Sequence, residues 1–296
     1  MKNFERFIGI DWSGAKTPIH TKTVAVAECA KGVEPPNLIA PITPKGWSRA
    51  DVSKWIKNLT LSSKRILIGI DANFGYAQEI AQAQFGNNVS YLDVWREVEK
   101  TCAATPNYFA QGFWETWPQY FWSEGKKPAH ITLPRRMVEN ACGQAGLGWP
   151  ESPFKLIGPK QVGKGGLAVM RMAYDLKKEL GDKICIWPFE HEIADSAQIV
   201  ISEIYPRQFL KRSGHGNAKI TTLPQLNTAL SYFQTKPIKD MADISDHDSD
   251  ALISAAGLRW LCGREEFIPR ALHYPALAPD QRSSRVEGWI FGVGAE

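Results

Sequence analysis

The residues of this 296-residue chain that could do chemistry are carboxylates at the ends of predicted strands. Two segments, Ile8–Asp11 and Ile68–Asp71, share the pattern apolar-Gly-Ile-Asp, so that each apolar run closes on an aspartate. An ionised carboxylate at the end of a buried strand is costly unless water, a partner or a metal ion meets it. Because ligands bind beside the C-terminal ends of parallel strands, adjacent parallel strands would bring Asp11 and Asp71 to one point. Two carboxylates that close repel each other, and a divalent cation is the usual remedy.

A second group of metal-capable residues lies at the start of an alanine-rich segment near position 250. It comprises Asp243, Asp246, His247, Asp248 and Asp250. Residues three or four apart share one face of a helix, so His247 and Asp250, or Asp246 and Asp250, could bind one ion. The alternative is that acids in a first helical turn cap free amides and that an Asp after a strand caps a turn. Five metal-capable groups within eight positions exceed what capping needs, so we favour a metal site.

Two further features bear on this site. Glu203 is the penultimate residue of a strand predicted over Ile199–Ile204, which makes it another candidate acid. Small residues follow Asp250, and they would let the predicted helix lie close to the sheet.

Apolar and β-branched runs predict the strands that must position these acids, and their order indicates an α/β fold. The predicted strands are residues 6–11, 21–29, 36–42, 65–71, 183–189 and 198–205. Apolar residues at helical spacing predict a helix over 48–59, and the alanine-rich segment predicts another from Asp246 to about Trp260. Three strands, a helix and a fourth strand are typical of a mixed sheet and not of a simple alternating βαβ array.

Residues 76–182 differ from the rest of the chain in composition. They are rich in aromatic residues and in glycine and proline, and the part from 121 to 180 holds ten Lys or Arg against five Asp or Glu. We therefore predict a single domain over residues 1–296 that carries 76–182 as a basic, mainly helical insertion. We interpret the aromatic run at 113–122 as the core of that insertion, with a stacking platform for unpaired bases as the alternative.

A glycine-rich segment, Gly158–Gly165, precedes a predicted helix. It fits a phosphate-binding loop until its last position, where glycine replaces the Ser or Thr that binds Mg²⁺, so we reject a nucleotide-hydrolysing P-loop. Backbone amides before a helix still suit an anion. We predict phosphate contacts from Lys160, Gly163, Lys164 and Gly165, with a plain tight turn and solvated lysines as the alternative.

Five blocks in order along the chain carry a resemblance. They are GIDWSGA at 9–15, IGIDANFG at 68–75, GPKQVGKGG at 158–166, SEIYPR at 202–207 and DHDSDALISAAG at 246–257, with EGWI at 287–290 as a further match. Together they resemble an uncharacterised family, domain of unknown function family 429, whose members are predicted to be ribonuclease H-like nucleases.

The resemblance implies a ribonuclease H-like mixed sheet of five strands flanked by helices. It also implies acids from the first strand, the fourth strand and the last helix, which correspond to Asp11, Asp71 and Asp250. The last block is similar to that of Holliday-junction resolvases, which have an acid or a histidine at the position of His247. The fourth acid is left open among Glu203, Asp246 and Asp248.

Composition narrows the class of protein. Five widely spaced cysteines without a CxxC pair indicate reduced thiols in a cytoplasmic protein, and no run of about 18 apolar residues could span a membrane. The net charge of +4 argues against tight, extended duplex binding, so a short, branched or single-stranded nucleic acid fits better as the partner.

We therefore predict metal-dependent phosphodiester hydrolysis on nucleic acid. The predicted catalytic acids are Asp11, Asp71, Asp250 and Glu203, and the predicted metal ligands are Asp11, Asp71, His247, Asp248 and Asp250. Two Mg²⁺ or Mn²⁺ ions suit this set because hard cations favour carboxylate oxygen. One alternative is an enzyme of the same fold that acts on a small phosphorylated molecule or nucleotide in a closed pocket. The other is a catalytically silent nucleic-acid-binding or scaffold protein, which is favoured if the acids fail to converge.

Overall fold

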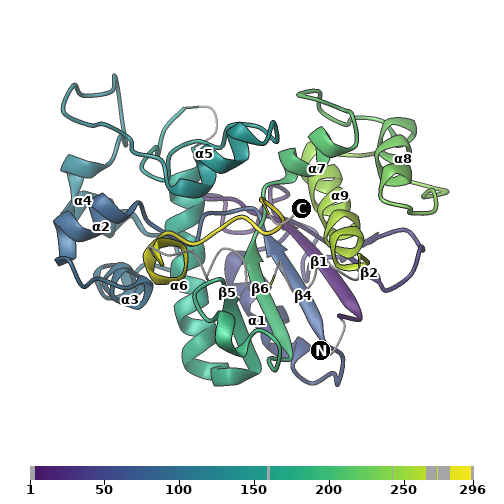
Figure 1. The fold of residues 1–296 in the computed structure, drawn as a ribbon, viewed down its shortest axis with the longest axis horizontal. Helices are drawn as coiled ribbons and strands as arrows, with labels where there is room; N and C mark the ends of the chain where they lie inside the picture. Colours follow the sequence, from purple (N-terminus) through teal and green to yellow (C-terminus); the bar gives the residue numbers. More distant parts are fainter. Residues whose placement is uncertain (1–3, 159–160, 242, 265–271, 273–280, 295–296) are drawn as a thin grey trace.

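The computed structural model describes residues 4–158, 161–241, 243–264, 272 and 281–294 (Figure 1). This part of the chain is an α/β fold with a six-stranded mixed sheet in the order β3-β2-β1-β4-β6-β5. The strands are β1 (Arg6–Asp11), β2 (Ala25–Ala30), β3 (Asn37–Leu38), β4 (Ile66–Ile70), β5 (Ile184–Trp187) and β6 (Ile199–Glu203). β2 is antiparallel to β1 and to β3, whereas β1, β4, β6 and β5 run parallel to one another.

Each of the six predicted strands lies in this sheet, so the sheet has one strand more than the five that the resemblance implied. β3 is much shorter than the predicted 36–42. Pro36 and Pro41 bracket it, and because proline has no amide hydrogen to donate, neither can extend the ladder. β2 starts at Ala25, four residues after the predicted start, where Thr21 makes only an isolated bridge to Trp47.

Helices cover both faces of the sheet, as the alternation of buried side chains requires. On one face Ile8, Ile10 and Ile68 pack with α1 (Arg49–Leu59), α3 (Tyr91–Cys102) and α6 (Val162–Leu180). On the other, Phe7 and Leu67 pack with α7 (Pro206–Arg212), α8 (Leu223–Tyr232) and α9 (Asp246–Cys262). Figure 1 shows α9 lying across β1 and β2.

The close approach of α9 to β1 depends on small residues on both elements. A Cβ at Gly9 would stand 2.4 Å from the carbonyl oxygen of Ala251 and 2.7 Å from the amide nitrogen of Ala255. The prediction that small residues after Asp250 bring the helix close to the sheet is confirmed. This contact holds the first turn of α9 beside the C-terminal end of β1.

The segment 76–182 holds α2 (Gln78–Phe85), α3, α4 (Gln111–Thr116), the short 3₁₀ turn η1 (Pro118–Tyr120), α5 (Met137–Gln144) and α6. Its aromatic residues form a buried cluster that includes Tyr76, Phe113, Phe121 and Phe154. This cluster belongs to the same core as the sheet, because α6 packs directly on the strands. The interpretation of the run at 113–122 as core is confirmed for Phe113, Trp114 and Phe121, which are buried.

The remaining short elements are η2 (Gly181–Lys183), η3 (His191–Ile193) and η4 (Ser283–Glu287), the last a single π-helical turn. The five cysteines are buried free thiols. Within the described ranges, no helix has the length and apolar character needed to cross a membrane.

Candidate functional site

Asp11 and Asp71 leave the sheet at the same edge. Asp11 is the last residue of β1, and Asp71 directly follows β4, the parallel neighbour of β1. The register pairs Ile10 with Ile70, and the amide of Asp71 donates a hydrogen bond to the carbonyl of Ile10 at 2.9 Å. The shared sequence pattern therefore places Asp11 and Asp71 side by side at the ends of adjacent strands.

The first turn of α9 adds two side chains to this edge. Nδ1 of His247 lies 2.5 Å from Oδ2 of Asp11, and Asp250 lies one turn further along the helix. Asp11, Asp71, His247, Asp250 and Glu203 all line one cavity of about 430 Å³. The structure thus brings together the predicted acids of two strands and the last helix.

The acids of this cavity have raised pKa values, chiefly because they are buried. Burial and the neighbouring Asp11 raise the pKa of Asp250 to about 7. Burial, Asp11 and Asp250 raise the pKa of Asp71 well above its usual range. Burial raises the pKa of Asp11 even though His247 opposes the shift. The hydrogen bond to Asp11 in turn raises the pKa of His247. The folded chain therefore holds these carboxylates at a cost that a cation would relieve.

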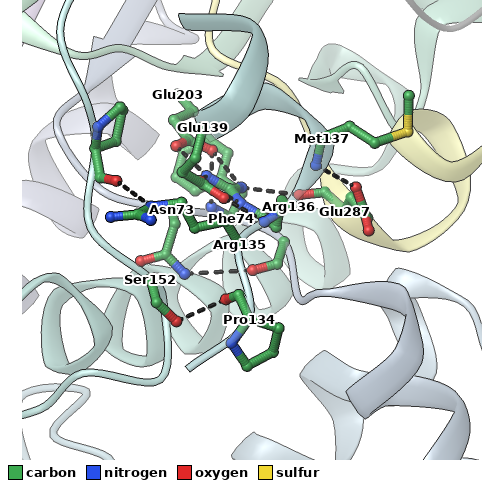
Figure 2. A network of polar contacts seen from close by, with 12 residues as sticks. Asn73, Phe74, Pro134, Arg135, Arg136, Met137, Glu139, Ser152, Glu203 and Glu287 are labelled. Carbon is green, nitrogen blue, oxygen red and sulfur yellow. Dashed lines mark hydrogen bonds and ion pairs between the residues drawn. The ribbon is translucent and has the colours of Figure 1, made fainter. Parts of the chain in front are cut away.

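Glu203 has a different environment, because a buried arginine already binds it (Figure 2). Two nitrogens of Arg136 donate to the two carboxylate oxygens of Glu203, at 2.8 and 2.6 Å. Arg136 also donates to Glu139 and to the carbonyl of Glu287, and the amide of Phe74 donates to Glu203. Burial alone would lower the pKa of Arg136, but Glu139 and Glu203 raise it. Glu203 therefore borders the cavity with both oxygens engaged by other groups.

The network around Arg136 joins distant parts of the chain. Arg136 precedes α5 in the segment 76–182, Glu203 ends β6, and Glu287 lies in the C-terminal turn η4. The carboxylate of Glu287 accepts from the amides of Gln78 and Met137, at 3.0 and 2.8 Å. Figure 2 shows Arg136 between Glu203 and Glu287. This network fixes the 76–182 segment against the sheet edge that carries the site.

The other acids near the start of α9 have structural partners. Asp248 accepts hydrogen bonds from the hydroxyl of Ser245 at 2.7 Å and from its amide at 3.3 Å, which makes a capping box. Asp246 pairs with Lys219. Neither side chain lines the cavity, although Asp246 and Asp248 are both near enough to raise the pKa of Asp11. Asp248 remains a predicted metal ligand that is engaged here as a helix cap.

The glycine-rich segment packs against the loop that follows β1. Lys160 lies outside the described residues. The amide of Gly163 donates to the carbonyl of Lys155 at 3.2 Å, and the ammonium group of Lys164 lies 5.9 Å from the centre of the Trp114 ring. Gly165 lines the cavity, and its carbonyl accepts from Nε1 of Trp12 at 3.1 Å. The phosphate contacts therefore remain a prediction. Of the residues predicted to make them, Gly165 lies at the cavity wall.

The donor set suits a hard divalent cation, because Asp11 and Asp250 raise the pKa of Asp71, and Asp11 raises the pKa of Asp250, at one cavity. A buried acceptor lies at the same wall: Oδ1 of Asn73 has no hydrogen-bond donor in the described chain. As the side chains are placed, no group of three His, Cys, Asp or Glu among the described residues is already arranged to hold a metal ion. Asp11, whose Oδ2 contacts His247, would have to turn toward its neighbours to bind one.

Several cavity residues were not found by reasoning from the sequence. They include Trp12, Asn73, Arg136, Trp149 and Arg207. Asn73 and Arg207 stand inside the quoted blocks at 68–75 and 202–207, so those blocks contained a signal. Arg136 and Trp149 lie in loops of the segment 76–182. Loop sequences have no hydrophobic periodicity, so nothing in the sequence indicates that these two residues reach the cavity at the sheet edge.

Comparisons of this chain with protein-family models, with curated proteins and with solved structures find no match. The resemblance therefore rests on the sequence blocks alone.

Proposed function

We propose that this protein is a ribonuclease H-like enzyme that hydrolyses phosphodiester bonds in nucleic acid with the help of divalent metal ions. One observation carries the proposal. Asp11 and Asp71 end neighbouring parallel strands at the same register, and Asp250 reaches the same cavity from the helix packed across β1. Carboxylates from two strand ends and a crossing helix are the arrangement that the resemblance implied.

The metal, Mg²⁺ or Mn²⁺, would be held by Asp11, Asp71 and Asp250, with His247 beside Asp250. Bound metal supplies charge neutralisation on the phosphate and lowers the pKa of a water molecule. The protein's contribution is to keep three carboxylates concentrated at a partly closed cavity. Asp11 hydrogen-bonds to His247, which raises the pKa of the imidazole and holds it at the wall of the cavity.

Nucleic acid as the substrate is supported by the charge of the segment that borders the cavity. Residues 121–180 carry ten Lys or Arg against five Asp or Glu, and this stretch supplies the cavity residues Arg136, Trp149 and Gly165. Five buried free thiols fit a reducing compartment, so we propose that the protein acts in the cytoplasm.

The test is a cleavage screen with end-labelled single-stranded, duplex and branched DNA and RNA in Mg²⁺ or Mn²⁺. We expect the wild-type protein to cut one of these substrates, EDTA to stop it, and Asp71→Asn to reduce the rate at least about 100-fold. Asp182→Asn is the matched control, because Asp182 is an exposed acid that pairs with Lys177 and lies outside the cavity. Cleavage that survives Asp71→Asn would overturn the assignment.

A second candidate is hydrolysis of a phosphate ester in a small nucleotide. The cavity volume of about 430 Å³ favours it, since this is within the range of pockets that enclose small ligands. Release of inorganic phosphate or of a nucleoside from mononucleotides, with no cleavage of any strand in the screen, would select this candidate over the first.

A further inference from the structure

Trp149 is an exposed aromatic side chain at the wall of the site cavity. It is 55% exposed, whereas Trp12, Trp95, Trp114 and Trp187 are buried. The described chain has a few other large hydrophobic side chains that are exposed, such as Leu61 and Tyr232, but Trp149 is the one among them that lines this cavity. An aromatic ring exposed at the wall of a cavity is a surface on which a nucleic-acid base can stack.

The ring of Trp149 is held by its back face. A Cβ added to Gly143 of α5 would stand 2.4–2.5 Å from Cδ2, Cε3 and Cε2 of the indole. Since these three atoms belong to the six-membered ring and are nearly equidistant from that point, Gly143 lies against the face of the ring. The guanidinium of Arg135 lies 6.0 Å from the ring centre. One face is therefore fixed against the protein, and the exposed area belongs to the rest of the ring.

Arg207 supplies a cation to the same cavity. The stem of Arg207 packs against the backbone of Gly148, the residue before Trp149, where an added Cβ would lie 3.1 Å from Cγ of Arg207. Nη1 of Arg207 is buried and has no hydrogen-bond acceptor among the residues that the structure describes. Arg207 lines the cavity with Asp71 and Asp250 and is close enough to oppose the rise in the pKa of both. An unsatisfied guanidinium nitrogen at this position suits a phosphate oxygen.

We propose that Trp149 and Arg207 form a nucleotide subsite, in which an unpaired base stacks on Trp149 and its phosphate lies against Arg207 beside the carboxylates. The base must be unpaired, because a base that stacks on the exposed part of the ring has to leave its own helix. The cavity volume of about 430 Å³ is enough to hold a nucleotide. This subsite deepens the proposed function by naming single-stranded nucleic acid as the substrate class. Binding at the subsite does not require hydrolysis; only the identity of the phosphate that is cut rests on the proposed function.

The test is fluorescence anisotropy of a labelled short oligothymidylate in Mg²⁺ on the full-length protein. Asp11→Asn serves as the parent so that the strand stays intact. We expect Trp149→Ala to weaken binding about 5- to 100-fold and Trp149→Phe to retain most of it, because a smaller ring still stacks. Tyr232→Ala is the matched control, since Tyr232 is an exposed aromatic residue outside the cavity. Equal affinities of the parent and Trp149→Ala would overturn the proposal.

Arg207 is tested with Arg207→Gln and Arg207→Lys, with Arg96→Gln as the control on the exposed face of α3. We expect the Gln variant to bind more weakly and to lose part of the salt dependence of binding, and the Lys variant to recover most of that dependence. Near-ultraviolet circular dichroism verifies that each variant is folded. Unchanged salt dependence in a folded Arg207→Gln variant would contradict a phosphate contact.

Two competition arms separate the sources of the nucleotide. Thymidine monophosphate that displaces the oligomer at similar concentration would show that a free nucleotide is the ligand and would overturn the strand as substrate. Duplex that competes as well as single strand would also overturn the proposal, because its bases are paired. Trp149-dependent binding of the strand in a protein that cleaves nothing would keep the subsite while the hydrolysis proposal fails, so the two failures are distinguishable.

Discussion

His247 on α9 contacts Asp11 on β1 across 236 residues of sequence, with 2.5 Å between Nδ1 and Oδ2. The contact ties the first turn of the last helix to the end of the first strand, which is the junction where the candidate site lies. It also makes the imidazole a reporter of the ionisation of Asp11.

The first prediction follows from that contact. The hydrogen bond to Asp11 raises the pKa of His247, so Asp11→Asn should lower the pKa of His247. The measurement is an NMR titration of the imidazole Hε1 signals, with the signal of exposed His130 as the internal control. An unchanged His247 titration in the variant would show that the two side chains do not interact in solution.

The second prediction concerns pH and metal. Burial raises the pKa of Asp250 from its ordinary value of 3.8 to about 7, so the folded protein binds more protons than the unfolded chain between these values. The metal-free protein should therefore lose stability as pH rises through this window and be less stable at about pH 8 than at about pH 5. Mn²⁺ should restore the melting temperature at about pH 8 by a few degrees and have little effect at about pH 5. Thermal melts at the two values check this, and a metal effect of equal size at both would contradict it.

The third prediction compares two buried acids. Burial and Asp11 raise the pKa of Asp71, so removing its charge with Asp71→Asn should stabilise the metal-free protein at about pH 8. Glu203→Gln should instead destabilise it by about 3 kcal/mol, because it leaves Arg136 without its bidentate partner. Urea denaturation in EDTA measures both. If Asp71→Asn is as destabilising as Glu203→Gln, the Asp71 carboxylate stabilises the fold and is not an unfavourably buried group kept for metal binding.

The fourth prediction separates two glycines. Gly9→Ala would place a methyl group 2.4 Å from the carbonyl of Ala251, so it should lower stability by about 1–3 kcal/mol and push α9 off β1. Gly165→Ala has ordinary contacts, the nearest at 3.4 Å to Trp12, and adds helix propensity to α6. It should be neutral or stabilising by up to about 1 kcal/mol. If Gly165→Ala destabilises the protein, the neighbouring backbone does not tolerate a methyl group at this position, and the prediction is wrong.

Much of the fold could be predicted from the sequence because its signals are local. Apolar runs that end in Asp11 and Asp71 mark strand ends, and the small residues after Asp250 mark a helix that packs closely. The shortness of β3 was not predicted, although prolines at 36 and 41 could have indicated it. The strand count of five came from the resemblance, whereas the residues themselves indicated the six that the sheet has.

The partners of the polar residues could not be predicted, because they depend on contacts between distant segments. Nothing in the sequence near Glu203 shows that Arg136, 67 positions earlier, binds both of its oxygens. The capping box of Asp248 was among the alternatives, since acids in a first helical turn commonly cap amides. Trp149 has no sequence signal that distinguishes it from the buried tryptophans, because exposure is decided by the packing of α5 beneath it.

The measurement that tests the central claim most directly is the location of Mn²⁺ by anomalous scattering in crystals of the wild-type protein, of Asp11→Asn and of Asp248→Asn. The account predicts Mn²⁺ bound by Asp11, Asp71 and Asp250 in the wild type, loss of the ion in Asp11→Asn, and retention in Asp248→Asn because Asp248 serves as a helix cap. No anomalous peak at this cavity in wild-type crystals soaked at millimolar Mn²⁺ would contradict it, and the chain would then be an α/β fold without the metal chemistry.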